Sequence, residues 1–340
     1  MKRRMFLFAA IASVAALVGC DNTTPTPAGT PAGSSGGGAA ASKTYVIGFI
    51  GKSQANDVFR VAEVGARDAV RELAEKNKVK VELIVRTPTE EDAIKQAEAI
   101  STLANQQVDA IILSASDSAT LEPAINDAVA KGVVVMTFDS DVPTSKRFAC
   151  YACDDVAAAH RLTDLLAKSM NEEGTIAILA GNQSAPNLQA RVNGVKDQLK
   201  KFPKMKLLEP NGVFYHQETP EKAAEAVASA MNANPGIQGW AMVGGWPLFT
   251  ENALRWEPGK VKVISWDALP AQLPYLKSGH VDVLLAQDCY GWGYKTVETV
   301  LDKLVNGKDP ANPMVIDPLT AVTKENVEEW GKKWEKWLPK

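Results

Sequence analysis

Short apolar runs alternate with longer amphipathic stretches along most of the chain. Residues 45–50 form a nearly continuous apolar run, which is typical of a buried strand, and residues 57–76 repeat apolar positions at the helical period. The same alternation continues toward the C-terminus. We predict further strands at 79–85, 109–113, 133–138, 148–153, 175–180, 206–213, 238–243, 261–265 and 281–286, and helices at 90–105, 121–131, 156–170 and 188–200.

This order of elements predicts an α/β fold. Apolar strands that are each followed by an amphipathic helix indicate parallel sheets covered on both faces. About 300 residues follow Lys43, which is large for one hydrophobic core and favours two doubly wound lobes. Near the C-terminus, Val327, Trp330, Trp334 and Trp337 recur at helical spacing, and we interpret this stripe as core packing.

The residues just after the predicted strands are polar, with aromatic residues among them. In open parallel sheets, ligands bind beyond the carboxyl ends of the strands. A ligand covered in hydroxyl groups suits this composition. The segments concerned are 52–56, 114–117, 139–141, 181–187, 244–246, 266–267 and 287–288.

The first residues predict export. Three basic residues at 2–4 precede an apolar run at 5–18 that has the length of a signal-peptide core. The run ends in Leu17-Val-Gly-Cys20, which resembles the lipobox of bacterial lipoproteins; the alternative is an ordinary signal peptide with a chance cysteine. We therefore expect a signal peptide at 1–19, a lipid on Cys20 and a flexible linker over 20–43, rich in Thr, Pro, Ala, Gly and Ser.

Charge and cysteine content narrow the class of protein. The net charge is −3, with 37 basic and 40 acidic residues well mixed, so nothing indicates nucleic-acid binding. After Cys20, three cysteines remain, Cys150, Cys153 and Cys289, and an odd number does not make a disulfide scaffold. Cys150 and Cys153 have redox or zinc spacing, but residues three apart on a strand face opposite sides. We expect both to be buried small residues, with no metal and no cofactor.

Two motifs could indicate an enzyme, a nucleotide hydrolase or a glycoside hydrolase, but neither matches the pattern that such an enzyme needs. Gly51-Lys52-Ser53 ends like a phosphate-binding loop, but the first glycine of that motif would fall at Val46. Asp139 and Asp267 could form the acid/base pair of a glycoside hydrolase. No nucleophile with a base stands out, and carboxylates that bind hydroxyl groups need only be ionised and positioned. We therefore predict a binding protein and not an enzyme.

Several motifs occur in an order that resembles a known family. They are Ile47-Gly-Phe-Ile50 with Asn56 and Phe59, Asp109-Ala-Ile-Ile-Leu-Ser114, Val135-Met-Thr-Phe-Asp139-Ser-Asp141, Asn187-Leu-Gln-Ala-Arg191-Val-Asn-Gly194, Val263-Ile-Ser-Trp-Asp267, Leu285-Ala-Gln287 and Val322-Thr-Lys-Glu-Asn326. Over Lys43 to about Glu329 the chain is similar to periplasmic sugar-binding proteins of the ribose/galactose type, relatives of the ligand domain of LacI-type repressors. Each motif alone is weak, and their order and spacing together carry the resemblance.

The resemblance implies the type I periplasmic-binding-protein fold, in which two lobes are joined by a three-segment hinge. The crossings would fall near Cys153–Asp154, Gln287–Cys289 and Ile316–Pro318. The N-terminal lobe would then comprise 44–153 plus 289–316, and the C-terminal lobe 154–288 plus 317–340.

The resemblance also implies sugar contacts by Asn56, Phe59, Asp139, Asn187, Arg191, Asp267 and Gln287. From their places after strands we add Lys52, Ser114 and Trp246. The alternatives are that an aspartate only caps a helix and that Phe59 belongs to the core. Lys52 and the stretch Gly244-Gly245-Trp246-Pro247 depart from the ribose-type pattern. Asp139 and Asp267 against Lys52 and Arg191 give a charge balance of zero, which favours a neutral ligand; a sugar acid stays open if Lys52 points inward.

Together these features predict the substrate-binding lipoprotein of an ABC sugar importer. It would be an extracytoplasmic monomer, anchored to the membrane by its lipid, that delivers a pentose, hexose or polyol to a permease. One alternative is a sensor that presents bound sugar or sugar acid to a membrane receptor. The weaker alternative is a sugar-acting enzyme.

Overall fold

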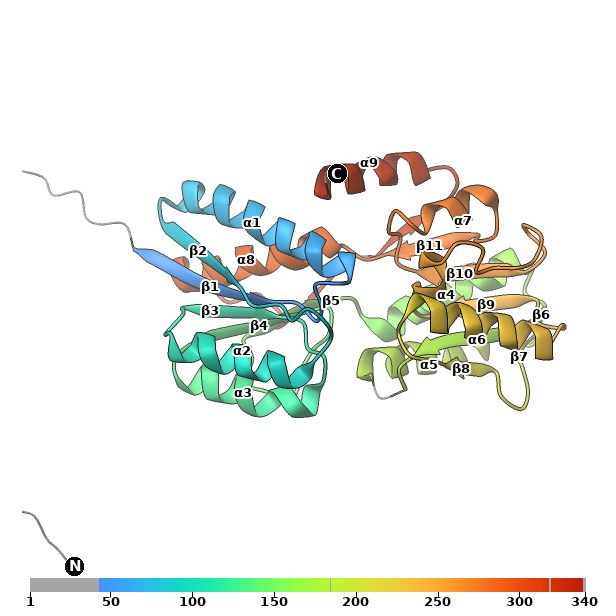
Figure 1. The fold of residues 1–340 in the computed structure, drawn as a ribbon, viewed down its shortest axis with the longest axis horizontal. Helices are drawn as coiled ribbons and strands as arrows, with labels where there is room; N and C mark the ends of the chain where they lie inside the picture. Colours follow the sequence, from blue (N-terminus) through green and yellow to red (C-terminus); the bar gives the residue numbers. More distant parts are fainter. Residues whose placement is uncertain (1–42, 184, 318, 339–340) are drawn as a thin grey trace, which may run out of the picture. The chain divides into compact units, whose positions relative to one another are not determined.

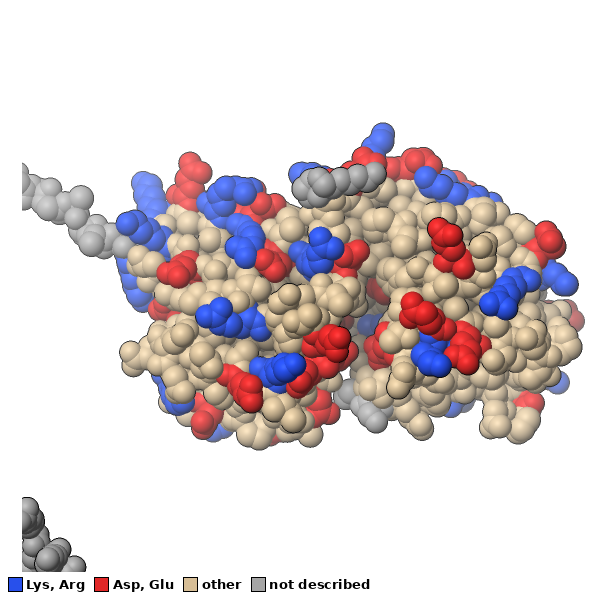
Figure 2. Space-filling view, in the orientation of Figure 1, with Lys and Arg blue, Asp and Glu red and all other residues tan. Residues whose placement is uncertain are grey.

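The computed structural model describes residues 43–183, 185–317 and 319–338. The predicted signal peptide, Cys20 and all of the predicted linker before Lys43 lie outside these residues. Within them, two mainly parallel sheets carry helices on both faces (Figure 1), which confirms the predicted fold class. Acidic and basic side chains are interspersed over the face shown in Figure 2.

The first sheet has six strands in the order β12-β5-β4-β3-β1-β2, all paired in parallel. Helices α1 and α8 pack together on one face, and α2 and α3 pack together on the other. The strands are β1 (Thr44–Ile50), β2 (Lys80–Val85), β3 (Ala110–Leu113), β4 (Val134–Phe138), β5 (Ala149–Ala152) and β12 (Met314–Ile316); the helices are α1 (Asp57–Asn77), α2 (Ala93–Asn105), α3 (Ser118–Ala130) and α8 (Cys289–Asn306).

The second sheet repeats this arrangement in the order β13-β11-β10-β9-β6-β7, with β8 also paired to β6. Only β13 runs antiparallel to its neighbour. The strands are β6 (Gly174–Gly181), β7 (Met205–Leu207), β8 (Val213–Tyr215), β9 (Gly239–Met242), β10 (Lys262–Trp266), β11 (Val283–Ala286) and β13 (Thr320–Val322). The helices are α4 (Asp155–Ser169), α5 (Pro186–Leu199), α6 (Pro220–Ala233), η1 (Trp246–Phe249), α7 (Leu273–Ser278) and α9 (Val327–Trp337).

The described chain passes between the sheets after β5, after β11 and after β12. Hydrogen bonds join these three crossings to one another. The amide of Asp317 donates to the carbonyl of Ala152 at 2.9 Å, and the amide of Asp288 donates to Asp317 Oδ2 at 2.9 Å. The hydroxyl of Tyr151 donates to Asp288 Oδ2 at 3.2 Å. The crossings therefore form one connected hinge region.

Helix α1 is held against α8 by two close contacts between backbones. A Cβ atom at Gly65 would lie 2.0 Å from the carbonyl oxygen of Tyr290, and one at Gly293 would lie 1.8 Å from that of Ala62. Only glycine permits this approach. At the start of α1, Asn56 Oδ1 accepts a hydrogen bond from the amide of Val58 at 3.2 Å. These contacts fix the end of α1 that faces the second lobe.

The predicted strand at 206–213 is wrong, because the structure has two short strands there, β7 and β8. Pro210 lies between them and has no N–H to donate to a ladder. Likewise α2 begins at Ala93 instead of residue 90, because Asp92 caps it through the amides of Ile94 and Lys95.

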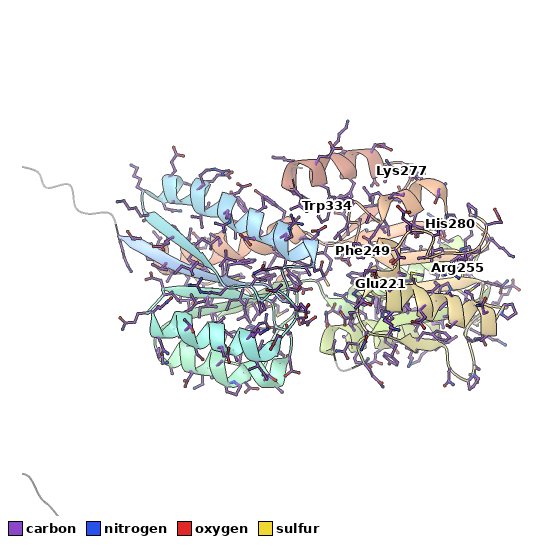
Figure 3. The ribbon with its side chains drawn as sticks, viewed as in Figure 1. Glu221, Phe249, Arg255, Lys277, His280 and Trp334 are labelled. Carbon is purple, nitrogen blue, oxygen red and sulfur yellow. The ribbon has the colours of Figure 1, made fainter. Side chains whose placement is uncertain are left out.

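The predicted burial of Cys150 and Cys153 and the packing of the tail stripe are confirmed, although Trp337 is only partly buried. Val327, Trp330 and Trp334 are buried, and Trp330 Nε1 donates to the carbonyl of Ala268 at 2.7 Å. Figure 3 labels Trp334 on the side of α9 that faces the rest of the protein. Cys150, Cys153 and Cys289 are buried and unpaired. No helix in the described ranges combines the length and apolar content that crossing a membrane requires.

Candidate ligand-binding site

A cavity lies where the carboxyl ends of strands from both sheets face each other. Apart from Ser114, every ligand-contact residue predicted from the sequence lines it. The lining residues are Lys52, Asn56, Val58, Phe59, Glu91, Ser116, Asp139, Ser140, Asn182, Ala185, Asn187, Leu188, Arg191, Glu218, Gly244, Trp246, Phe249, Asp267, Gln287 and Trp292.

Asp139 and Asp267 are placed by the same local structure in the two lobes. Asp139 follows β4, and its amide donates to the carbonyl of Tyr151 on the neighbouring strand β5 at 3.0 Å. Asp267 follows β10, and its amide donates to the carbonyl of Leu285 on β11 at 2.8 Å. Their φ angles are 56° and 64°, in the left-handed region that few residues other than glycine adopt. Such strained backbone is often found at binding sites.

Asp139 has two partners in its own lobe. Ser114 Oγ donates to Asp139 Oδ2 at 3.0 Å, and Lys52 Nζ lies 3.5 Å from the same oxygen. Ser114 is fully buried at the end of β3 and does not line the cavity. We therefore assign Ser114 to orienting the Asp139 carboxylate, in place of the direct ligand contact that the sequence predicted.

Asp267 is oriented by Gln287, whose Nε2 donates to Asp267 Oδ1 at 2.8 Å. Burial raises the pKa of Asp267, while this hydrogen bond and the nearby Arg191 act in the opposite direction. Gln287 is itself 6% exposed. The carboxylate and the amide therefore present one fixed polar group to the cavity.

Arg191 projects from α5 and is almost completely buried. Its Nε donates to Asp155 Oδ1 at 2.7 Å, its Nη1 donates to the carbonyl of Val243 at 3.1 Å, and its guanidinium lies 4.0 Å above the centre of the Trp266 ring. Burial alone would lower the pKa of Arg191, but Asp155 holds it above its ordinary value. A guanidinium carries five N–H donors, so some remain for a ligand.

Aromatic rings line the cavity on both sides. Phe59 and Trp292 belong to the first lobe, with ring centres 6.2 Å apart, and Phe59 also packs against Phe138 in the core. Phe59 therefore belongs to the core and also lines the cavity, and its contact with a sugar stays a prediction. In the second lobe, Trp246 and Phe249 are the first and last residues of the short helix η1, and both line the cavity. Phe249 is labelled in Figure 3.

The Trp246 ring lies directly against Gly244. A Cβ atom at that glycine would come within 2.2 Å of the ring, so a larger residue there would displace the ring. The His216 ring packs against it in a T-shaped arrangement, with ring centres 5.1 Å apart. Trp246 is therefore held in place as a wall of the cavity.

Sequence reasoning missed two acidic residues at the cavity, Glu91 and Glu218. Glu91 comes six residues after the last residue of β2, and Glu218 comes three residues after the end of β8, of which the predicted strand at 206–213 covered only Val213. Glu218 Oε1 accepts a hydrogen bond from the amide of Asn182 at 3.2 Å. The surface of Glu91 as a whole is exposed to solvent. The surroundings of its carboxyl nevertheless raise its pKa through partial burial, and the negative charges of Glu218 and Asp139 raise it further.

Trp292 and Phe249 were also missed, because both project from helices and not from strand ends. In the described part of the chain, no three His, Cys, Asp or Glu residues are arranged to hold a metal ion. The cavity thus offers carboxylate, amide and guanidinium groups between aromatic rings, which is the chemistry of hydroxyl and ring recognition.

Comparison with known proteins also indicates a ligand-binding protein. Residues 47–309 match the model of the periplasmic binding protein domain family. The chain is 28% identical over 293 residues to a D-ribose/D-allose-binding protein of Pseudomonas aeruginosa, covering 82% of this chain and 88% of that protein. It is 29% identical over 252 residues to a xylitol-binding protein of Mycolicibacterium smegmatis, covering 70% and 67%.

A crystal structure of an ABC transporter solute-binding protein from Burkholderia graminis in complex with D-arabinose has a similar fold. The TM-score is 0.73 at 25% sequence identity, and the match covers 84% of this chain and 97% of that one.

Proposed function

The chain belongs to the periplasmic binding protein domain family, and we propose that it binds a neutral monosaccharide or a related polyol for an ABC importer. The observation that carries this proposal is the convergence of Asp139 and Asp267, from opposite lobes, on one cavity walled by aromatic rings. Relatives that bind D-ribose, D-allose and xylitol, as their names state, support the ligand class.

The proposed contacts follow from the shape of each group. A carboxylate, an amide or the guanidinium fork can bridge two neighbouring hydroxyl groups. Asp139 and Asn56 would act from the first lobe, and Asn187, Arg191, Asp267 and Gln287 from the second. Phe59 and Trp246 would cover the C–H faces of the sugar ring. A ligand held this way contacts both lobes, so its binding favours the closed arrangement.

We place the lobe boundaries at the three crossings, so that 44–153 plus 289–316 form one lobe and 154–288 plus 317–340 the other. The closed, sugar-loaded form would be delivered to a membrane permease. The family implies an extracytoplasmic location. We further propose that a lipid on Cys20 anchors a monomer beside that permease, and mass spectrometry of the native N-terminus tests the anchor.

A thermal-unfolding screen of the purified protein tests the ligand class. Pentoses, hexoses, polyols and the corresponding sugar acids are compared, because a ligand at 100 times its dissociation constant stabilises the folded state by about 2.7 kcal/mol. We expect a neutral sugar or polyol to give the largest shift in melting temperature. A screen in which no such compound stabilises the protein contradicts the proposal.

A further inference from the structure

The charges on the cavity wall do not balance. Two cationic side chains, Lys52 and Arg191, face four carboxylates, those of Glu91, Asp139, Glu218 and Asp267, among the described residues. The balance of zero predicted from the sequence lacked Glu91 and Glu218. Glu91 belongs to the first lobe and Glu218 to the second, and acidic side chains border the hollow between the two halves in Figure 2.

Both cations are already paired with carboxylates of the protein. Arg191 donates to Asp155 at 2.7 Å behind the cavity wall. Lys52 Nζ lies 3.5 Å from Asp139 Oδ2, and the two side chains are 16% and 9% exposed. Neither cation is therefore left over to neutralise an acidic ligand.

The pKa shifts around Lys52 agree with this surplus of negative charge. Burial by itself lowers the pKa of a lysine. The pKa of Lys52 is nevertheless raised, because Asp139, Glu91 and Glu218 together outweigh its burial. The carboxylates thus act on Lys52 from both lobes.

We propose that Lys52 is the internal counterion of this cavity and that the site selects ligands by charge, admitting neutral sugars and excluding sugar acids. This rests on the proposed sugar-binding function and defines its substrate class. A ligand carboxylate would enter a site that already holds more carboxylates than cations and would be repelled by them. A protonated amino sugar would instead be repelled by the Lys52 ammonium, which already pairs with Asp139.

The substitution Lys52→Met separates this role from direct binding of an acidic ligand. Methionine keeps the length of the side chain and removes the charge, so Asp139, Glu91 and Glu218 lose their counterion. We expect the variant to gain affinity for protonated amino sugars, relative to the neutral sugar, by about tenfold or more. If Lys52 instead paired with a ligand carboxylate, the wild type would bind the sugar acid more tightly than the neutral sugar.

The substitution Glu218→Gln tests the acidic surplus in the opposite direction. Glu218 is exposed at the cavity rim, so the variant should fold normally, and glutamine can still accept the hydrogen bond from Asn182. Removing one carboxylate should reduce the discrimination against sugar acids by about tenfold. Lys200→Met serves as the control, since that lysine side chain is 76% exposed and does not line the cavity.

The experiment is calorimetric titration with matched sets of probes. D-Glucose, D-glucuronate and D-glucosamine form one set, and D-galactose, D-galacturonate and D-galactosamine form a second. D-Ribose with D-ribonate extends the acid comparison to a pentose. Wild type, Lys52→Met, Glu218→Gln and Lys200→Met are each measured at a pH below the pKa of the amino sugars, and thermal unfolding of each variant confirms that it is folded.

We expect the wild type to bind the neutral member of a set at least about a hundredfold more tightly than the acid, and Lys52→Met to shift its preference toward the amine. Equal wild-type affinity for the acid and the neutral sugar overturns the charge rule while leaving sugar binding intact. Failure of Lys52→Met to shift its preference toward the amine does the same. Failure of every neutral and charged probe to bind contradicts the proposed function itself, and the charge rule with it.

Discussion

Asp139 and Asp267 stand at equivalent positions of two sheets that share one strand order, with φ angles of 56° and 64°. Each amide donates to a carbonyl on the next strand of its sheet, to Tyr151 at 3.0 Å and to Leu285 at 2.8 Å. The same backbone turn therefore supplies one carboxylate from each lobe. A ligand between the lobes would meet two matching polar groups, one on each side.

We expect Arg191→Met to destabilise the fold as well as to abolish ligand binding. The change leaves Asp155 without its 2.7 Å partner, and removing one member of a buried ion pair costs about 3 kcal/mol or more. Denaturant unfolding measures the loss. The double variant Arg191→Met with Asp155→Asn should recover part of it, and Arg60→Met, at a side chain that is 58% exposed, should change stability by less than about 0.5 kcal/mol.

Ser114→Ala should weaken sugar binding by about threefold to tenfold, because Asp139 loses the hydroxyl that holds its Oδ2. A double-mutant cycle with Asp139→Asn separates an indirect role from a direct one. In the Asp139→Asn background, Ser114→Ala should have little further effect. Full additivity of the two changes would indicate that Ser114 contacts the ligand itself. Ser118→Ala is the control, since that hydroxyl donates to the carbonyl of Asp141 outside the cavity.

Trp246→Ala should weaken binding by about tenfold and should remove most of the fluorescence change that the ligand induces. Trp246→Phe keeps an aromatic wall and should retain most of the affinity. Trp240→Phe is the matched control, because Trp240 is fully buried in the second lobe and does not line the cavity. Unchanged affinity in Trp246→Ala would show that this ring does not cover the ligand.

Asp317 makes stability depend on pH, because burial raises its pKa to about 6. In the unfolded chain this carboxyl titrates near pH 4, so the folded state holds the proton more tightly. Its contribution to stability is complete below about pH 4, falls as the pH rises and is lost above about pH 6. Asp317→Asn should therefore be more stable than the wild type at neutral pH, by about 1–3 kcal/mol, and equal to it near pH 4. A difference that grows toward low pH would contradict this assignment.

Most of the fold and much of the site could be predicted, because the relevant signals are local. Apolar runs followed by amphipathic helices indicate covered parallel sheets, and the ends of parallel strands converge. Asp139, Asp267 and Gln287 follow strands directly, so their convergence on one cavity was expected. Ser114 also ends a strand, but strand periodicity does not show that it lies behind Asp139.

Glu91 and Glu218 could not be predicted in the same way. Glu91 lies in a loop between β2 and α2, and Glu218 lies in a loop between β8 and α6. Which loop residues reach a cavity depends on the packing of the whole lobe, and helix-borne Trp292 presents the same difficulty. The charge of the site therefore became clear only in three dimensions.

Calorimetric titration of the wild type, Asp139→Ala and Asp267→Ala is the most direct test of the account. The panel comprises D-ribose, D-allose, D-arabinose, D-glucose, D-galactose, xylitol and myo-inositol, and Lys200→Met serves as the control. We predict that at least one of these neutral compounds saturates the wild type at one molecule per protein. Each alanine substitution should weaken that binding by about tenfold to a few hundredfold, since sugar hydroxyls lose a charged partner. No binding by any of these compounds, or an affinity unchanged in both alanine variants, would contradict the account.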